Sequence, residues 1–559
     1  MTTLTQDMLP ESCTLLIKYC DMIWSINESN YKTILEAISN CIETDLLSIE
    51  QILQISDFIA ETRPNDLRYV FKVCKKLLQK NNLQNGYSLF TRSQHLRALL
   101  VKENLITGFI PPQFIPKTQD EIFEIFQPQS FEHAILWDDL DHLQKLCLYP
   151  EFDYNISLNG TTLIDMSTKY GSVTCFRYLL MNNARITNIT LENSFIGNNY
   201  EIVHICERSL PITAICMINA VHNYHNETVQ YLQTKYRLDY TWSNAFYSCN
   251  LPCFFNKLFL TNDINSVDSQ GNNALMVSVK AGICPVVEFL LDNNAMIDKK
   301  NGQGNTPLML AAQNNQTKVI SLLLKRGSQM EMQGSNGKTP LLHAASCDKL
   351  ESVVLLLKNG ANIESKDGNE RTPLIYASMN GKTDIVNVLL DFGANTEARD
   401  HQMWTSLMIA SHYNRVEVVK LLLERNADKE AADVQNLTSI LIATENNNVD
   451  VVKLLVDKGC NIEACGFNGM TALLSANSKN YVNIMKILLE KNANIEHHDV
   501  NGRTPLIYAA MNNNVEAFKL LIEYKADINA TDNDGFNSLN YATQNNCEQI
   551  LEILSGLSK

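Results

Sequence analysis

Along the second half of the chain, hydrophobic residues recur in a pattern that predicts two short helices in every 33 residues. Each unit opens on an anchor of Thr or Asn, then Pro, Ser or Ala, then Leu or Ile. The anchors begin at Asn273, Thr306, Thr339, Thr372, Thr405, Thr438, Thr471, Thr504 and Asn537. The spacing holds without insertion, which indicates units stacked in one repeated geometry.

The polar residues between the helices predict where each helix begins and ends. In the unit that opens at Thr306, this residue suits the N-cap and Pro307 suits the first helical position. The turn between the two helices favours a residue that tolerates positive φ. That place holds Gly282, Asn315, Asp348, Gly381, Asn414, Asn447, Asn480, Asn513 and Asn546. After the second helix, a short polar segment predicts a projecting hairpin that leads to the next anchor.

These residues resemble a known repeat family. The segment Thr339-Pro-Leu-Leu-His-Ala-Ala, followed by Val353-Val-Leu-Leu-Leu-Lys-Asn-Gly-Ala-Asn, resembles the ankyrin repeat in both period and element order. The resemblance covers residues 266–559 and implies an all-α fold, a curved α-solenoid. It also implies that hairpin tips and first helices form a concave surface that usually binds other proteins, and that His343 makes a hydrogen bond that braces its hairpin.

Upstream, residues 129–265 continue the pattern in weaker form. Tyr240-Thr-Trp stands in register 33 residues before Asn273, and shorter units surround Thr162 and Asn193. This stretch resembles the divergent ankyrin-like block of unknown function that precedes regular repeats in some proteins. We therefore expect divergent repeats at 129–265 and nine regular repeats at 266–559.

Residues 1–128 show no such register but carry helical periodicity over 15–24, 31–42, 49–59 and 69–78. They predict a separate helical module, to which the residues assign no function. The segment from Phe109 to Lys117, with three prolines in six residues, excludes a helix and is the expected boundary.

Composition and charge narrow the class of partner and the compartment. The formal charge of −15 opposes binding to phosphate backbones, so nucleic acid is not an expected partner. The N-terminus lacks a basic region followed by an apolar run, and no apolar stretch approaches the ~18 residues that cross a bilayer. The fifteen cysteines are scattered and odd in number, which fits reduced thiols. We expect a cytoplasmic protein, with a nuclear location possible, and no membrane insertion.

The sequence predicts neither a cofactor nor catalysis. Gly337-Lys338-Thr339 ends like a phosphate-binding loop, but Met332 occupies the place of the first glycine and the tripeptide falls at a hairpin. No nucleophile elbow, zincin helix or kinase motif set is present, and stacked repeats offer shallow grooves in place of an enclosed pocket.

No metal site is expected either. Cys249 with Cys253, and Cys460 with Cys465, are the closest cysteine pairs, and each would need two further ligands to bind zinc. The neighbouring histidines 497 and 498 fall in a hairpin, where we expect them to be solvated.

Units that share a stacking geometry differ in what they present to solvent, and the differences concentrate between 370 and 503. The glycine two places before the anchor is replaced in three consecutive units by Glu370, Met403 and Asn436. Apolar and aromatic residues with Arg at the edges are typical of interface hot spots. The predicted partner-binding residues are Arg371, Met379, His401, Gln402, Trp404, His412, Tyr413, Leu437, Phe467, Met470, Arg503 and Met511.

The favoured interpretation is a protein-binding scaffold or adaptor that uses the concave face of the array. Four alternatives stay open at this point. The stripe around Trp404 could only pack hairpin against hairpin; the N-terminal module could recruit a client to an enzyme complex; the array could be a structural spacer; or residues 1–128 could have an enzymatic role that depends on a partner.

Overall fold

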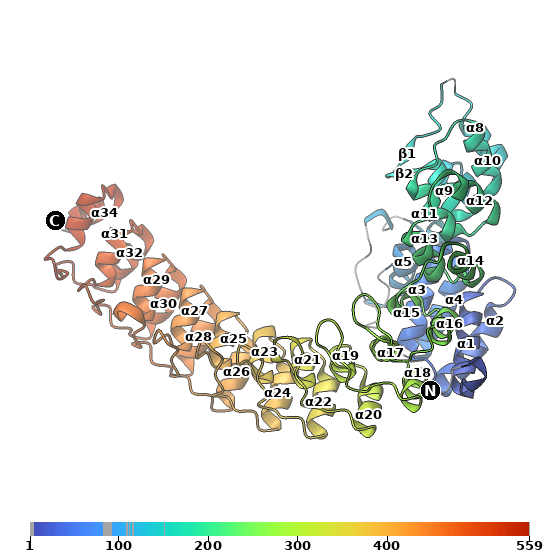
Figure 1. Ribbon diagram of the computed structural model, residues 1–559. Helices are drawn as coiled ribbons and strands as arrows, with labels where there is room; N and C mark the ends of the chain where they lie inside the picture. The colour runs from blue at the N-terminus through green and yellow to red at the C-terminus, as the bar shows by residue number, and fades with distance from the viewer. Residues whose placement is uncertain are drawn as a thin grey trace. The chain divides into compact units, whose positions relative to one another are not determined.

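The computed structural model describes residues 5–81, 92–107, 110, 112–114, 117–123, 125–149 and 151–557, and they are mainly short α-helices joined by turns (Figure 1). The chain forms two compact units, Met1–Ile297 and Asp298–Lys559. The all-α solenoid expected from the sequence is confirmed in both units. The only β-ladder within the described residues joins β1 (Ser157–Leu158) to β2 (Thr161–Thr162).

The first unit contains the N-terminal module, the divergent block and the helix pair of the first regular repeat. The module helices are α1 (Glu11–Trp24), α2 (Tyr31–Glu43), α3 (Ile49–Thr62), α4 (Leu67–Asn81), α5 (Gln94–Lys102) and α6 (Gln119–Phe123). The repeat helices are α7 (Phe131–Leu136), α8 (Leu140–Leu146), α9 (Leu163–Tyr170), α10 (Val173–Met181), α11 (Asn188–Gly197), α12 (Tyr200–Ser209), α13 (Ala214–His222), α14 (Asn226–Tyr236), α15 (Trp242–Tyr247), α16 (Leu251–Thr261), α17 (Ala274–Ala281) and α18 (Cys284–Asp292).

The second unit contains the remaining eight regular repeats, each a pair of helices of seven to ten residues. They are α19 (Pro307–Gln313) with α20 (Thr317–Lys325), α21 (Pro340–Ser346) with α22 (Leu350–Lys358), α23 (Pro373–Asn380) with α24 (Thr383–Asp391), α25 (Ser406–His412) with α26 (Val416–Glu424), α27 (Ser439–Glu445) with α28 (Val449–Asp457), α29 (Ala472–Ser478) with α30 (Val482–Glu490), α31 (Pro505–Met511) with α32 (Val515–Glu523), and α33 (Ser538–Gln544) with α34 (Glu548–Leu557).

The predicted caps and turns are confirmed. The anchor side chain accepts a hydrogen bond from the third backbone N–H of the following helix in eight of the nine regular repeats, and the exception is Thr438. All nine turn positions, from Gly282 to Asn546, have positive φ. Short polar residues at the caps and flexible or amide residues at the turns therefore fix where each helix begins and ends.

Stacking buries one face of every helix in the second unit. Each first helix packs on the first helices of its neighbours, as α21 does on α19 and α23, and the second helices form a parallel row (Figure 1). Leu341, Ala344 and Ala345 of α21 are fully buried or nearly so. Small residues at the paired Ala positions let neighbouring helices approach closely, and the leucines fill the space between them.

The N-terminal module packs against the helix turns of the divergent repeats inside the first unit. Helix α1 contacts α16 and α18. The Trp24 indole N–H donates to the Ser248 carbonyl at 3.0 Å, and its ring stacks on Tyr224 with centroids 5.1 Å apart. The amide of Gln51 donates to the carbonyl of Ala281 at the next turn along. The four helices expected for residues 15–78 are confirmed, as α1 to α4.

The two compact units divide between Ile297 and Asp298, which lies after the first regular repeat. The sequence predicts different boundaries, after residues 128 and 265, because these follow changes in how regular the repeats are. The three sequence regions that they define stay a proposal. Much of the proline-rich segment 109–117, the expected boundary, lies outside the described residues.

Candidate functional site

An aspartate five residues before the anchor shapes most hairpins of the second unit. In the hairpin that ends at Trp404, Oδ1 of Asp400 accepts the backbone N–H groups of Gln402 and Trp404 at 2.9 and 3.0 Å. Equivalent pairs of bonds hold the hairpins of Asp367, Asp433, Asp499 and Asp532. A buried carboxylate that accepts two N–H groups fixes the tip, so the tip side chains project in a defined direction.

The second carboxylate oxygen often takes a bond from a tyrosine on the first helix of the same repeat. Tyr376 donates to Asp367 at 2.7 Å, and Tyr508 and Tyr541 make the same bond in their own repeats. His343 holds the position of these tyrosines, but its buried Nε2 has no hydrogen-bond partner. The bracing bond implied for His343 is therefore not made through this nitrogen, because Gly334 stands where the repeats of these three tyrosines have the aspartate.

Trp404 bridges two hairpins. Its indole N–H donates to Oδ2 of Asp433, in the next repeat, at 2.9 Å. The ring packs with Leu437 on a buried cluster of Met408, Ala431 and Ile442. Trp404 and Leu437 are each half-buried, so part of both side chains packs hairpin against hairpin and part remains accessible.

A hollow of about 390 Å³ opens beside Trp404, between two hairpin tips and the ends of three first helices. It brings together four of the predicted residues: Gln402, Trp404, His412 and Leu437. The His412 ring lies edge-on to Trp404, with centroids 5.2 Å apart, and burial lowers the pKa of this histidine. The imidazole is therefore held in its neutral form at neutral pH, which suits an apolar lining.

Exposed apolar side chains occupy three consecutive tips, the first of which, that of Val434, lines this hollow. Val434, Phe467 and Val500 occupy the same tip position in successive repeats and are 72%, 69% and 61% exposed. Tyr413, beside His412, is also exposed. Monomeric proteins rarely expose several large apolar side chains next to one another. Such a cluster on a surface therefore indicates a site of interaction.

The other predicted residues lie on the same array but not in the hollow. Arg371 and Arg503 sit at the position of Trp404 in other repeats, and each places its Nε about 4 Å from the aspartate of the next hairpin. Met379 and Met511 lie in the last turn of their first helices, and their carbonyls accept bonds from the repeat that follows. The backbone N–H of His401 joins its tip to the preceding one. Met470 lies at the base of the tip two repeats further along the chain.

Sequence reasoning missed three charged residues of the hollow: Asp433, Glu445 and Lys479. Asp433 could have been found, because aspartate stands at this position, five residues before the anchor, in six of the nine regular repeats. Glu445 and Lys479 carry no such signal, since they stand at first-helix ends where polar residues are common.

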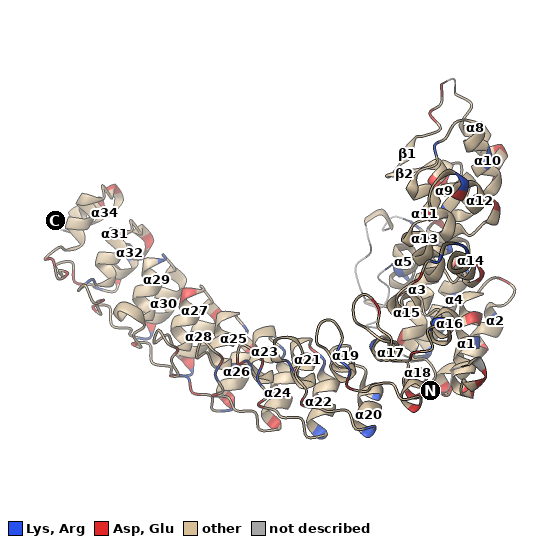
Figure 2. Cartoon of the chain, in the orientation of Figure 1, with Lys and Arg blue, Asp and Glu red and all other residues tan. Residues whose placement is uncertain are grey.

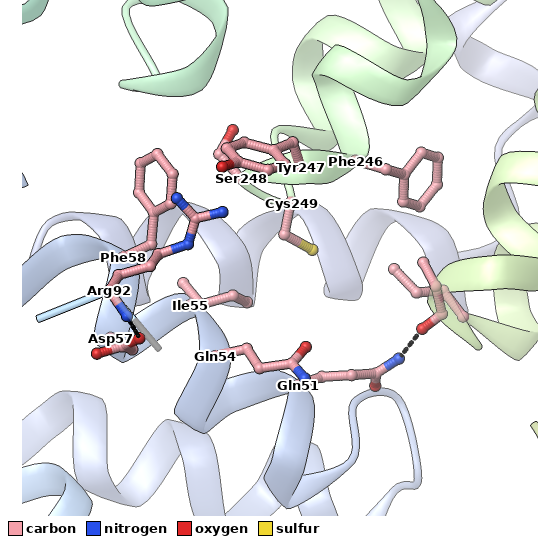
Figure 3. Close-up of a pocket in the computed structure, with 12 residues that line it drawn as sticks. Gln51, Gln54, Ile55, Asp57, Phe58, Arg92, Phe246, Tyr247, Ser248 and Cys249 are labelled. Carbon is pink, nitrogen blue, oxygen red and sulfur yellow. Dashed lines mark hydrogen bonds between the residues drawn. The ribbon is translucent and has the colours of Figure 1, made fainter. Parts of the chain in front are cut away.

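A second hollow, of about 280 Å³, lies inside the first unit between the module and the helix turns (Figure 3). The guanidinium of Arg92 lies 4.6 Å from the Phe58 ring centroid and 4.1 Å from that of Tyr247. Burial raises the pKa of Asp57 to about 6, although the N–H groups of Arg92 and Ser93 donate to it. Its charged and aromatic groups are engaged with one another, so this hollow serves to join the module to the repeats.

The cysteine pairs considered as metal ligands point to different partners. Cys249 lies 3.7 Å from Cys20, whereas Cys253 donates to Asn226, and burial raises the pKa of Cys253 to about 12. Exposed Cys465 lies 3.6 Å from His497. The described residues contain no cluster of three or more potential metal ligands. The expected lack of a metal or cofactor stays a prediction.

Charged residues of both signs are interspersed along the elements that Figure 2 draws in the second unit. Lys338, the lysine of the incomplete phosphate loop, lies over the Tyr376 ring at 4.4 Å. None of the described helices combines the length and apolar character needed to cross a membrane. The expectation that nucleic acid is not a partner stays a prediction.

Comparison with protein families identifies the architecture. The model for ankyrin repeats (3 copies) matches residues 294–367, 363–433, 429–499 and 494–558, and the model for ankyrin repeats (many copies) matches 257–311. A domain of unknown function (DUF3447) matches 181–257, within the divergent block. None of the curated proteins matches the chain. Ankyrin repeats serve protein–protein interaction and are typically not enzymatic. The ankyrin matches together span more than half of the sequence, and the chain belongs to the ankyrin-repeat family.

Proposed function

We propose that this chain is an intracellular scaffold or adaptor that binds a partner protein on the hairpin tips and first helices between Arg371 and Met511. The observation that carries the proposal is the exposure of Val434 and Phe467 beside the hollow next to Trp404. Adjacent helices stack about 8–10 Å apart, so the four or five repeats involved offer a surface roughly 40 Å long. A surface of that length suits an interface of ordinary size.

Trp404 contributes to both the fold and the proposed surface. Its N–H holds Asp433, so truncation would disturb the hairpin as well as any contact with a partner. Trp404→Ala is therefore a poor test of binding by itself. Exposed tip residues are better targets, because their side chains do little for the folded state.

The test compares two exposed changes in the full-length chain. Val434→Ser combined with Phe467→Ser should abolish co-purification of the partner from a cytosolic extract, since hot-spot contacts commonly contribute about 2 kcal/mol or more. Phe392→Ser is the matched control, because Phe392 is an exposed aromatic at the end of α24, away from the tips. Equal recovery of the same protein by both variants would place the interface elsewhere.

The N-terminal module fits a different role from client recruitment. Trp24 and Phe58 face the helix turns of the same unit, where they contact Tyr224 and Tyr247. We infer that the module covers the turn edge of the divergent repeats. A cytoplasmic location, with a nuclear one as the alternative, is part of the proposal and is supported by the many buried thiols, such as Cys20 and Cys253.

A further inference from the structure

Two cysteines from distant parts of the chain meet where the N-terminal module contacts the divergent repeats. Sγ of Cys20, on α1, lies 3.7 Å from Sγ of Cys249, in the turn between α15 and α16. Both side chains are buried, and the two residues are 229 positions apart. The two thiols therefore lie directly on the contact between the module and the repeats.

Cys249 stands at an unusual place for a cysteine. It lies 33 residues before Gly282, at the turn position that the nine regular repeats fill with Gly, Asn or Asp. Its φ is 55°, in the left-handed region, where other L-residues are strained. Residues held in such conformations cluster at functional sites. The strained cysteine at this turn therefore points to a use for its thiol.

The contacts around the two cysteines hold both backbones in place. Trp24, one helical turn after Cys20, donates its indole N–H to the carbonyl of Ser248 at 3.0 Å. Asn250, on the other side of Cys249, donates its side-chain amide to a carbonyl of the preceding repeat at 2.9 Å. A disulfide bond is about 2.05 Å long, so the two sulfur atoms would have to approach by about 1.7 Å. Rotation about the two Cα–Cβ bonds supplies a movement of this size, and neither backbone has to leave its place.

A small oxidant has access to one of the two thiols. Cys249 lines the hollow of about 280 Å³ between the module and the helix turns, and Figure 3 draws its sulfur among the lining side chains. A cavity needs about 10–15 Å³ to hold one water molecule, so this hollow has room for hydrogen peroxide. Cys20 is fully buried, and its contact with Cys249 and its burial raise the pKa of its thiol well above the usual range. Cys249 is therefore the residue that meets an oxidant first, and Cys20 is the residue that reacts with the product.

We propose that peroxide converts Cys20 and Cys249 to a disulfide that locks the N-terminal module onto the repeats. In the first step, the Cys249 sulfur attacks one oxygen of hydrogen peroxide, the O–O bond breaks, and a sulfenic acid and one water molecule form. In the second step, the Cys20 sulfur attacks the Cys249 sulfur, the S–O bond breaks, and the oxygen leaves as a second water molecule with the thiol proton. The two thiols lose two electrons in all, and the peroxide gains them.

The lock closes only under oxidising conditions. In a reducing compartment both thiols stay reduced, and a disulfide there is transient. The hydrogen bonds of Trp24 and Gln51 to the helix turns then hold the module without a covalent bond. A disulfide between residues 229 positions apart closes a long loop, and links of this kind restrict the opened state most strongly. The proposal goes beyond the proposed function and does not depend on the hairpin tips.

Peptide mapping of the full-length chain tests the bond itself. The purified chain is treated with hydrogen peroxide, its remaining thiols are blocked with iodoacetamide, and it is digested with trypsin without a reductant. Mass spectrometry should find residues 19–32 linked to residues 238–257. The second peptide also contains Cys253, whose thiol donates to Asn226. Cys253→Ser is therefore the matched control and should form the same link, whereas Cys249→Ser should not.

Limited proteolysis of the same samples tests the lock. Oxidation should slow digestion of the module by about tenfold or more, and dithiothreitol should restore the original rate. Cys249→Ser should be digested at the same rate with and without peroxide, while Cys253→Ser should respond as the unaltered chain does. The comparison of the unaltered chain before and after oxidation does not depend on how well either variant folds.

Three outcomes would overturn the proposal. The first is a link from Cys20 to Cys41 or Cys253 in place of Cys249. The second is the absence of any link under conditions that oxidise the exposed thiol of Cys465, which serves as an internal measure of the oxidant. The third is a complete link between Cys20 and Cys249 that leaves the rate of digestion unchanged, because the bond would then form without locking the module.

Discussion

Replacing Glu370 by glycine should stabilise the second unit, although it removes a side chain. Glu370 has φ of 59°, in the left-handed region, at the place where most regular repeats have the turn glycine. An L-residue costs roughly 1–2 kcal/mol in this conformation. Glycine avoids that cost but adds about 0.5–1 kcal/mol of backbone entropy to the unfolded chain. The exposed ion pair of Glu370 with Lys366 contributes little.

The balance is a gain of about 0.5–1 kcal/mol in the free energy of unfolding for Glu370→Gly. Two neighbouring repeats supply the controls. Asn436 has φ of 59° but belongs to a residue type that tolerates it, so Asn436→Gly should change the stability little. Met403 has φ of 65°, but more than half of its surface is buried. Loss of that contact should offset the relief of strain in Met403→Gly.

Urea unfolding followed by circular dichroism measures these differences in the full-length chain. The transition of the second unit should move to higher urea for Glu370→Gly, with a rise of about 1–3 °C in its thermal midpoint. The order of the three variants is the stringent result, since it does not depend on the absolute cost of left-handed backbone. A lower midpoint for Glu370→Gly, or a gain for Asn436→Gly as large as that for Glu370→Gly, would refute the reasoning.

Three further predictions concern the hairpins, the module and the repeat array. Burial alone would raise the pKa of Asp499, but hydrogen bonds from the Arg503 N–H and the Tyr508 hydroxyl lower it overall. Because the pKa of the folded state lies below that of the unfolded state, the contribution of Asp499 to stability should be full above about pH 4 and should fall as the pH drops further. Urea titration at each pH should show a weaker pH dependence for Asp499→Asn. Trp24→Phe leaves the buried Ser248 carbonyl without its hydrogen-bond donor. The free energy of unfolding should fall by about 1–3 kcal/mol, and the module should be digested faster by a protease. The fragment 298–559 should be helical and unfold cooperatively by circular dichroism, because it is a compact unit with its own stacked core; a disordered spectrum would contradict this.

The repeat geometry could be predicted because backbone conformation restricts residue type at a few positions. Asn315, Asn414 and Asn447 tolerate positive φ, and the structure places all three there. A threonine directly before an apolar helical run indicates the N-cap of that helix. These requirements act within four residues, so a single sequence displays them.

The docking of the N-terminal module could not be predicted, because it depends on contacts between residues two hundred or more positions apart. Trp24 is one apolar residue in a helical pattern, and nothing nearby in sequence points to Ser248 or Tyr224.

The candidate surface was predicted in part. Comparison of the tips located Trp404, Leu437 and Phe467, because side chains that differ between repeats are visible in the sequence. The sequence did not show that Trp404 and Leu437 are half-buried between hairpins while Phe467 projects into solvent. Local pattern gives residue types at each tip, whereas exposure depends on how neighbouring tips pack.

The position of the altered tips argues against random divergence of the repeat sequence. Random loss would affect caps and turns as often as tips, yet Thr372, Thr405 and Thr471 keep their capping bonds. Thr438 is the exception, and its buried hydroxyl has no hydrogen-bond partner. A lost cap costs about 1 kcal/mol, and this one directly follows the hairpin that carries Val434 and Leu437. Binding sites tend to occupy the less stable parts of a fold, so this concentration of local cost at one hairpin is what a site maintained for a partner would show.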